Sequence, residues 1–139
     1  MQSTADILDP IKPLDLTLVR TQLLHNGMSE REFAEAESEY RKFLALSRAY
    51  PDDILRPSKI VDMLWHTHIL YTRKYTDDCS TLVGRYLHHQ PDVADPAATK
   101  ERAALRDRTL QLYENHFGKP PEMWLADRTC TAPGCQNNG

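Results

Sequence analysis

Apolar residues in this chain recur every three to four positions over long stretches, and no segment alternates convincingly between apolar and polar residues. Such spacing is typical of amphipathic helices rather than strands. It predicts helices over about 13–26, 29–50, 58–75 and 97–117, with a short helix from about 76 to 83. We therefore predict an all-α fold, a compact bundle of about four to five helices.

Local signals mark the ends of these helices. Ser29 followed by Glu32 forms a capping box, in which each side chain bonds the backbone of the other residue. Ser58 is a favourable N-cap for the next helix. Glycines at 27, 84 and 118 follow the expected helix ends, where a left-handed residue commonly stops a helix.

The segment 58–75 carries apolar residues on most of its sides. Ile60, Val61 and Leu64 share one face, but Met63 and Leu70 make the other side partly apolar as well. A helix that is apolar on most sides is usually buried. We therefore expect this helix to lie at the centre of the bundle, with the other helices around it.

The length of 139 residues predicts one domain. We expect a flexible arm over 1–12, a single helical domain over 13–127, and a flexible tail with cysteines over 128–139. The net charge of −3 argues against a nucleic-acid partner. No apolar run is long enough for a bilayer and no signal peptide is evident, so we expect no membrane partner and a cytoplasmic location.

Chemically capable side chains concentrate between positions 62 and 89. Imidazole and thiolate are the usual ligands for zinc, copper and related metals. The sequence thus predicts a transition-metal site, for zinc ahead of copper or iron, in a protein that would be a metal-dependent enzyme if one coordination position stays open. The predicted ligands are His66, His68, Cys79, His88 and His89, with Asp62, Tyr75 and Asp78 as outer partners.

Helix geometry limits which of these side chains can cooperate. On a straight helix His66 and His68 point about 200° apart, so they cannot both bind one ion. His68 and Cys79 would lie about 16 Å apart along the axis, and they meet only if the chain turns, which we expect at Thr76–Asp77. Asp62 is four residues before His66, the spacing for a carboxylate that orients an imidazole.

Two other functions fit the same residues. In the first, the domain is metal-free and binds a protein or peptide, with structural buried histidines and with Trp65 and Trp124 lining a groove. In the second, Cys79 is a nucleophile activated by a nearby histidine. Cys130 and Cys135 form a small disulfide, add soft ligands or remain free thiols. The sequence also leaves a small molecule open as the binding partner.

The segment from Tyr40 to Trp124 contains the motif Asp62-x-x-Trp65-His66-x-His68, the pair Asp78-Cys79, and Phe117-Gly118 followed by Trp124. With these motifs it resembles the glycine-rich domain-containing protein-like family of plants and bacteria, in its bacterial single-domain type. It implies a small, mostly helical domain but no particular reaction. The residues that it marks as important are Asp62, Trp65, His66, His68, Tyr75, Asp78, Cys79 and His88.

Overall fold

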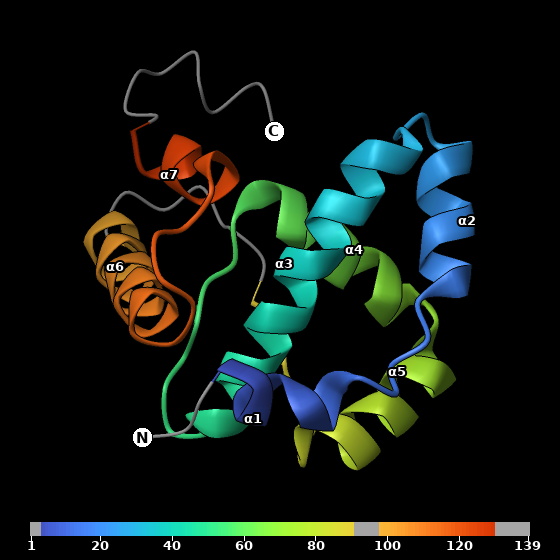
Figure 1. Ribbon diagram of the computed structural model, residues 1–139, viewed down its shortest axis with the longest axis horizontal. Helices are drawn as coiled ribbons and strands as arrows, with labels where there is room; N and C mark the ends of the chain where they lie inside the picture. Colours follow the sequence, from blue (N-terminus) through green and yellow to red (C-terminus); the bar gives the residue numbers. More distant parts are fainter. Residues whose placement is uncertain (1–3, 91–97, 130–139) are drawn as a thin grey trace.

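The computed structural model describes residues 4–90 and 98–129. These residues form helices joined by short segments and contain no strand, which confirms the predicted all-α fold (Figure 1). The elements in order are α1 (Thr4–Leu8), the 3-10 turn η1 (Asp9–Ile11), α2 (Thr17–His25), α3 (Glu30–Ala49), α4 (Lys59–Leu70), α5 (Thr72–Asp78), the π-helical turn η2 (Cys79–Val83), α6 (Thr99–Phe117) and α7 (Glu122–Thr129).

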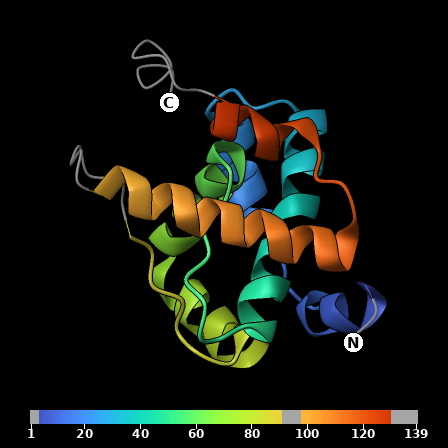
Figure 2. The same cartoon turned by 90° about the vertical axis from the view of Figure 1, so that its left-hand side faces the viewer.

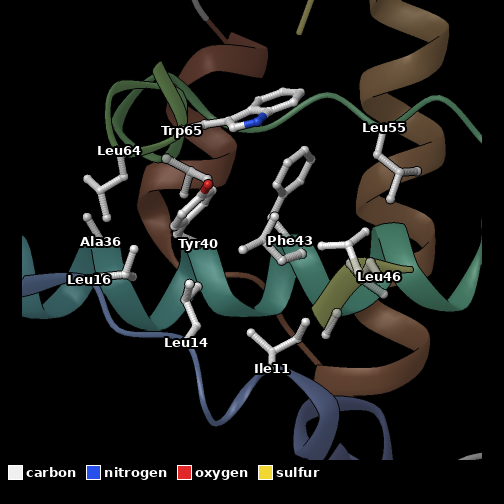
Figure 3. Packing of buried hydrophobic residues seen from close by; sticks show 14 of the residues in the cluster. Ile11, Leu14, Leu16, Ala36, Tyr40, Phe43, Leu46, Leu55, Leu64 and Trp65 are labelled. Atoms are coloured by element: carbon white, nitrogen blue, oxygen red, sulfur yellow. The ribbon is translucent and has the colours of Figure 1, made fainter. Parts of the chain in front are cut away.

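Helix α3 is the element around which the others are arranged. It begins at the predicted capping box: Ser29 accepts a bond from the Glu32 amide, and the Glu32 carboxylate accepts one from the Ser29 amide. It contacts α1, η1, α2, α4, η2 and α6. Tyr40 and Phe43 on α3 are fully buried, and Figure 3 shows their rings beneath Trp65. The helix at the centre is therefore α3 rather than the segment 58–75.

The helix predicted over 58–75 is two helices. Ser58 caps α4 as expected, by accepting a hydrogen bond from the Val61 amide. Tyr71 then leaves the helical conformation, with φ −85° and ψ 71°, and its amide bonds the carbonyl of His68 three residues back. The chain thus turns at Tyr71, not at Thr76–Asp77. One side of α4 faces solvent, because Met63 is 48% and Leu70 65% exposed.

The arm predicted over residues 1–12 is not seen between residues 4 and 11, which are helical. Ile7 and Ile11 are only 3% and 1% exposed, so their burial holds this segment on the body. Arg41 of α3 adds two hydrogen bonds from its guanidinium, to the carbonyl oxygens of Ile11 (3.2 Å) and Leu14 (2.8 Å). The burial of Ile7 and Ile11 and the hydrogen bonds of Arg41 thus hold this segment in place.

The second half of the chain covers one side of α3 and α4. Gly84, with φ 95°, ends η2 as predicted, and an irregular segment, 84–90, follows. Figure 2 shows α6 crossing in front of the extended connection that precedes α4. Helix α7 docks through Trp124, which is 2% exposed. No helix in the described part of the chain is long and apolar enough to cross a membrane.

Candidate functional site

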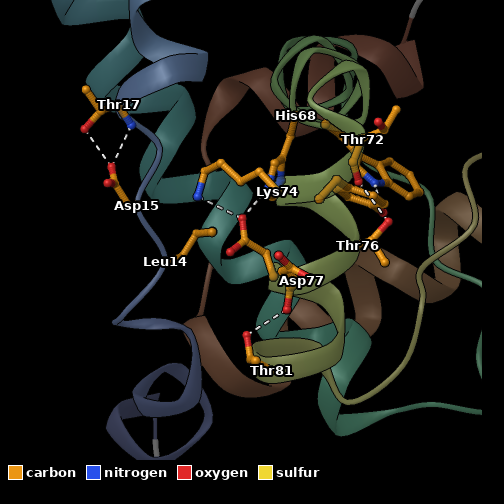
Figure 4. Close-up of polar contacts among 12 residues, drawn as sticks. Leu14, Asp15, Thr17, His68, Thr72, Lys74, Thr76, Asp77 and Thr81 are labelled. Atoms are coloured by element: carbon orange, nitrogen blue, oxygen red, sulfur yellow. Dashed lines mark hydrogen bonds and ion pairs between the residues drawn. The ribbon is translucent and has the colours of Figure 1, made fainter.

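His68 belongs to a buried chain of hydrogen bonds that we call the buried network. Its members are Tyr40, His68, Lys74 and Asp78. The Tyr40 hydroxyl lies 2.7 Å from His68 Nδ1, and His68 Nε2 lies 2.8 Å from Asp78 Oδ2. Since a carboxylate only accepts, Nε2 carries the proton and Nδ1 accepts from Tyr40. Lys74 Nζ lies 3.0 Å from the same carboxylate oxygen, and Figure 4 shows Lys74 and His68 near each other.

Burial decides the charge of this imidazole. His68 is 1% exposed, and desolvation lowers its pKa below the ordinary value, although Asp78 opposes that shift. The ring is therefore neutral near pH 7, with both nitrogens already hydrogen-bonded. A metal ion would have to displace Tyr40 or Asp78 to reach either nitrogen.

Cys79 is buried beside this network and is 2% exposed. Burial raises the pKa of its thiol above the ordinary value, while the polar contacts with the Leu87 backbone and with the Tyr75 side chain act the other way. The cavity that His68, Asp78 and Cys79 line measures about 10 Å³, near the volume that one water needs. A protonated thiol in a closed space does not fit the nucleophile predicted from the sequence.

Tyr75 connects the core to the segment 84–90. Its hydroxyl accepts a hydrogen bond from Trp65 Nε1 at 2.8 Å and donates one to the carbonyl oxygen of Leu87. Burial raises the pKa of Tyr75 far above its ordinary value, so the phenol stays protonated. The segment that carries His88 and His89 is thereby fixed against α4.

Asp62 and His89 form a second imidazole–carboxylate contact, which we call the cavity pair. His89 Nε2 lies 2.6 Å from Asp62 Oδ1, and the His89 ring lies against Trp65 with centroids 4.5 Å apart. The His89 side chain is 16% exposed and that of Asp62 43%. Asp62 therefore orients His89, which lies on the segment 84–90. It does not orient His66, which follows it on the same helix.

His66 and His88 are both exposed. The His66 ring is 6.2 Å from the His89 ring, measured between centroids. The His88 ring turns toward Tyr86, with centroids 4.7 Å apart. The structure thus divides the predicted ligands into a buried set, His68 and Cys79, and an accessible set, His66, His88 and His89.

The cavity pair faces a cavity of about 690 Å³. Its wall is made by the connection 51–57, the start of α4, the segment 85–90 and the side of α6 between Thr99 and Arg106. Ser47 of α3 also reaches it. The lining residues include Asp62, Trp65, His88 and His89. They do not include His66 or Trp124. Trp65 and Trp124 therefore do not line this cavity together, and a groove between them stays a prediction.

No three His, Cys, Asp or Glu side chains of residues 4–90 and 98–129 converge closely enough to hold a metal ion. Cys130 and Cys135 lie outside the described residues, so their role stays a prediction. The structure instead brings together cationic residues that sequence reasoning did not single out. Arg85, Arg102 and Arg106 line the cavity. No periodic signal marks them, because they come from two segments that meet only in the fold.

Comparison with known proteins places the chain in a family. The profile of the UCP032817-like family matches residues 13–115. The chain belongs to that family. Two relatives from Arabidopsis thaliana confirm the resemblance carried by the sequence motifs at the family level. Glycine-rich domain-containing protein 1 is 32% identical over 88 residues, which is 60% of this chain and 11% of the relative.

Glycine-rich domain-containing protein 2 is 27% identical over 96 residues, or 66% of this chain and 12% of the relative. The chain thus spans a small part of the length of these two plant proteins. No solved structure matches it.

Proposed function

We propose that this domain binds a small polar molecule in the 690 Å³ cavity, with the cavity pair as its recognition group. The observation that carries the proposal is the hydrogen bond between His89 and Asp62 at the cavity wall, 2.6 Å long. The volume lies within the roughly 300–1,000 Å³ of small-molecule sites. Such sites combine apolar walls with a few placed polar groups, and Trp65 beside His89 is that combination.

The cavity pair also has the arrangement of an acid–base group. A carboxylate that holds one imidazole nitrogen fixes the tautomer and leaves the other nitrogen to exchange a proton with a bound molecule. Asp62 holds Nε2 of His89, so Nδ1 is the nitrogen that would serve a ligand. If the bound molecule is a substrate, His89 is the residue that moves its proton and Asp62 is a positioning residue.

The two tryptophans make this proposal testable in the unmodified protein. Trp65 lines the cavity, whereas Trp124 is buried against Glu39, with its Nε1 2.9 Å from the carboxylate. Their indole N–H signals in a nitrogen-15 NMR spectrum therefore report separately on the cavity and on the distant core. We expect some members of a library of small polar compounds to shift Trp65 and leave Trp124 unchanged.

Matched variants give the control for that screen. Asp62→Asn replaces the charged partner of His89 with a neutral amide and should weaken binding about tenfold, a loss of about 1.4 kcal/mol. Asp77→Asn changes an exposed carboxylate on α5 that does not line the cavity, so binding should be unchanged. The proposal fails if no compound moves Trp65, or if Asp62→Asn and Asp77→Asn bind alike.

A transition metal, zinc ahead of copper or iron, is the second candidate for this region. The observation in its favour is the distance of 6.2 Å between the rings of His66 and His89, with Asp62 behind His89. Metal-bound histidines commonly give their second nitrogen to such a carboxylate. His66 and His89 would supply two ligands, and water or a bound molecule the others.

Element analysis of protein purified without a tag or chelator tests the metal directly, followed by zinc titration. His66→Ala and His89→Ala should each lower the bound zinc, while His25→Ala, an exposed histidine at the end of α2, should not. Equal zinc content in all three variants would exclude this site.

A further inference from the structure

One part of the cavity wall carries a buried hydroxyl without a hydrogen-bond partner. Ser47 lines the cavity and is 1% exposed, and its buried Oγ has no partner among the described residues. Leaving a buried hydroxyl unpaired costs about 1–3 kcal/mol, and alanine would suit the interior of α3 better. A ligand group bound against this part of the wall would give the hydroxyl a partner.

A guanidinium is held beside that hydroxyl. Arg85 Nη1 donates to the carbonyl oxygen of Ser47 at 2.9 Å, which ties the arginine to α3. Arg85 also lines the cavity. The planar fork of an arginine presents further N–H groups that match the two oxygens of a carboxylate or phosphate. Ser47 and Arg85 thus bring one buried hydroxyl and one oriented cation to the same part of the cavity wall.

The charge around the cavity has the sign that suits an anion. Five cationic side chains and three carboxylates line it among the described residues, a surplus of two positive charges with the histidines neutral. The whole chain, in contrast, carries a net charge of −3. A surplus of positive charge around a cavity raises the local concentration of anions.

We infer that the ligand carries an oxyanion, a carboxylate or a phosphate. Arg85 and the Ser47 hydroxyl hold this oxyanion at their part of the cavity wall. The inference rests on the proposed small-molecule function and names the chemical class of the ligand. The rest of the ligand extends along Trp65 toward the cavity pair.

Four simple probes separate charge from shape. Benzoate and phenyl phosphate present the two oxyanions, benzamide is a neutral analogue of benzoate, and benzylamine is a cation. We expect one or both oxyanion probes to shift the Trp65 indole and the Arg85 Nε signals, with benzamide at least about tenfold weaker and benzylamine weaker still. Benzoate against phenyl phosphate then decides between the two sources of the oxyanion.

Arg85→Gln should reduce the affinity of the oxyanion probe at least about tenfold, and Arg85→Lys should restore part of it. Arg48→Gln is the matched control, because Arg48 is also on the α3 side, donates to the carbonyl oxygen of Leu82 at 3.1 Å, and does not line the cavity. Its affinity should equal that of the unmodified protein.

Ser47→Ala keeps the test valid if Arg85→Gln fails to fold. Removing an unpartnered buried hydroxyl should leave stability unchanged or higher, while the affinity for the oxyanion falls several-fold. A purely structural serine would not give that pair of results.

Equal binding of benzamide and benzoate would overturn the inference and leave the small-molecule function standing. Absence of any oxyanion binding at Trp65 would also overturn it. If only neutral library compounds then bind there, the proposed function survives alone.

Discussion

The buried network and the cavity pair each contain a histidine–aspartate contact, and in each contact one of the two residues lies on α4. In each, an imidazole Nε2 meets a carboxylate at 2.8 Å or less. They differ in their surroundings: His68 is 1% exposed with both nitrogens bonded, whereas the His89 side chain is 16% exposed beside a 690 Å³ cavity. A histidine–aspartate contact is therefore a structural device in one place and a candidate binding group in the other.

The position of each partner explains the difference. His68 points from α4 toward Tyr40 of the central helix, and the bend at Tyr71 folds Asp78 back over it. Asp62 lies on another face of α4 and meets His89 of the irregular segment 84–90. The two contacts therefore differ because they lie on different faces of α4, and not because their residue types differ.

The largest effect that separates the two regions is expected from histidine truncation. His68→Ala removes a filled core position and leaves the Tyr40 hydroxyl and Asp78 short of a partner, which should lower the free energy of unfolding by about 2–4 kcal/mol. His66→Ala, two residues away on the exposed face, should change it by less than about 0.5 kcal/mol. Urea unfolding followed by circular dichroism measures both. Similar losses in the two variants would contradict the contrast.

A smaller effect is expected from pH. The pKa of His68 is below its ordinary value in the folded protein, so the unfolded chain binds more protons as the pH falls through about 6.5. The contribution of a neutral His68 is complete above that pH and is lost as the pH falls toward the folded pKa. The free energy of unfolding should fall by up to about 1.4 kcal/mol per pH unit there.

His68→Gln supplies the control for the pH experiment, because glutamine cannot titrate. Urea unfolding of both proteins between pH 7.5 and pH 5 should give a shallower acid-side loss in the variant. Parallel pH profiles would mean that His68 is not the group responsible.

The smallest effect on stability is expected at the cavity pair. Asp62→Asn breaks a contact whose carboxylate side chain is 43% exposed, and such pairs contribute about 0–1 kcal/mol. The free energy of unfolding should fall by less than about 1 kcal/mol, although hydrogen exchange in the segment 85–90 should accelerate. A loss as large as that of His68→Ala would make the cavity pair a core interaction and remove the contrast.

A third polar cluster shows how far apart in sequence such partners lie. Glu39 is 5% exposed on α3, although the helical pattern places most of its glutamates on the solvent side. Tyr113 of α6 and Trp124 of α7 donate to its Oε1, and Lys42 binds its Oε2 at 3.1 Å. These contacts hold α6 and α7 against the central helix α3, but no pattern near Glu39 in the sequence predicts them.

The amino-acid sequence by itself determined the helical class, the capping box at Ser29, the N-cap at Ser58 and the stop at Gly84. Each depends on interactions within a few residues or on the backbone freedom of one glycine. The sequence also located the concentration of histidines on and after α4 and supported the family. It did not determine which histidine meets which carboxylate.

Only the tertiary structure decided those pairings. Asp62 bonds His89, 27 residues away, and not His66, four residues away, because the segment 84–90 returns over α4. The cavity likewise joins Ser47 and Arg85, 38 residues apart. The placement of residues 4–11 on the body also arises from long-range packing, because Ile7 and Ile11 are removed from water there.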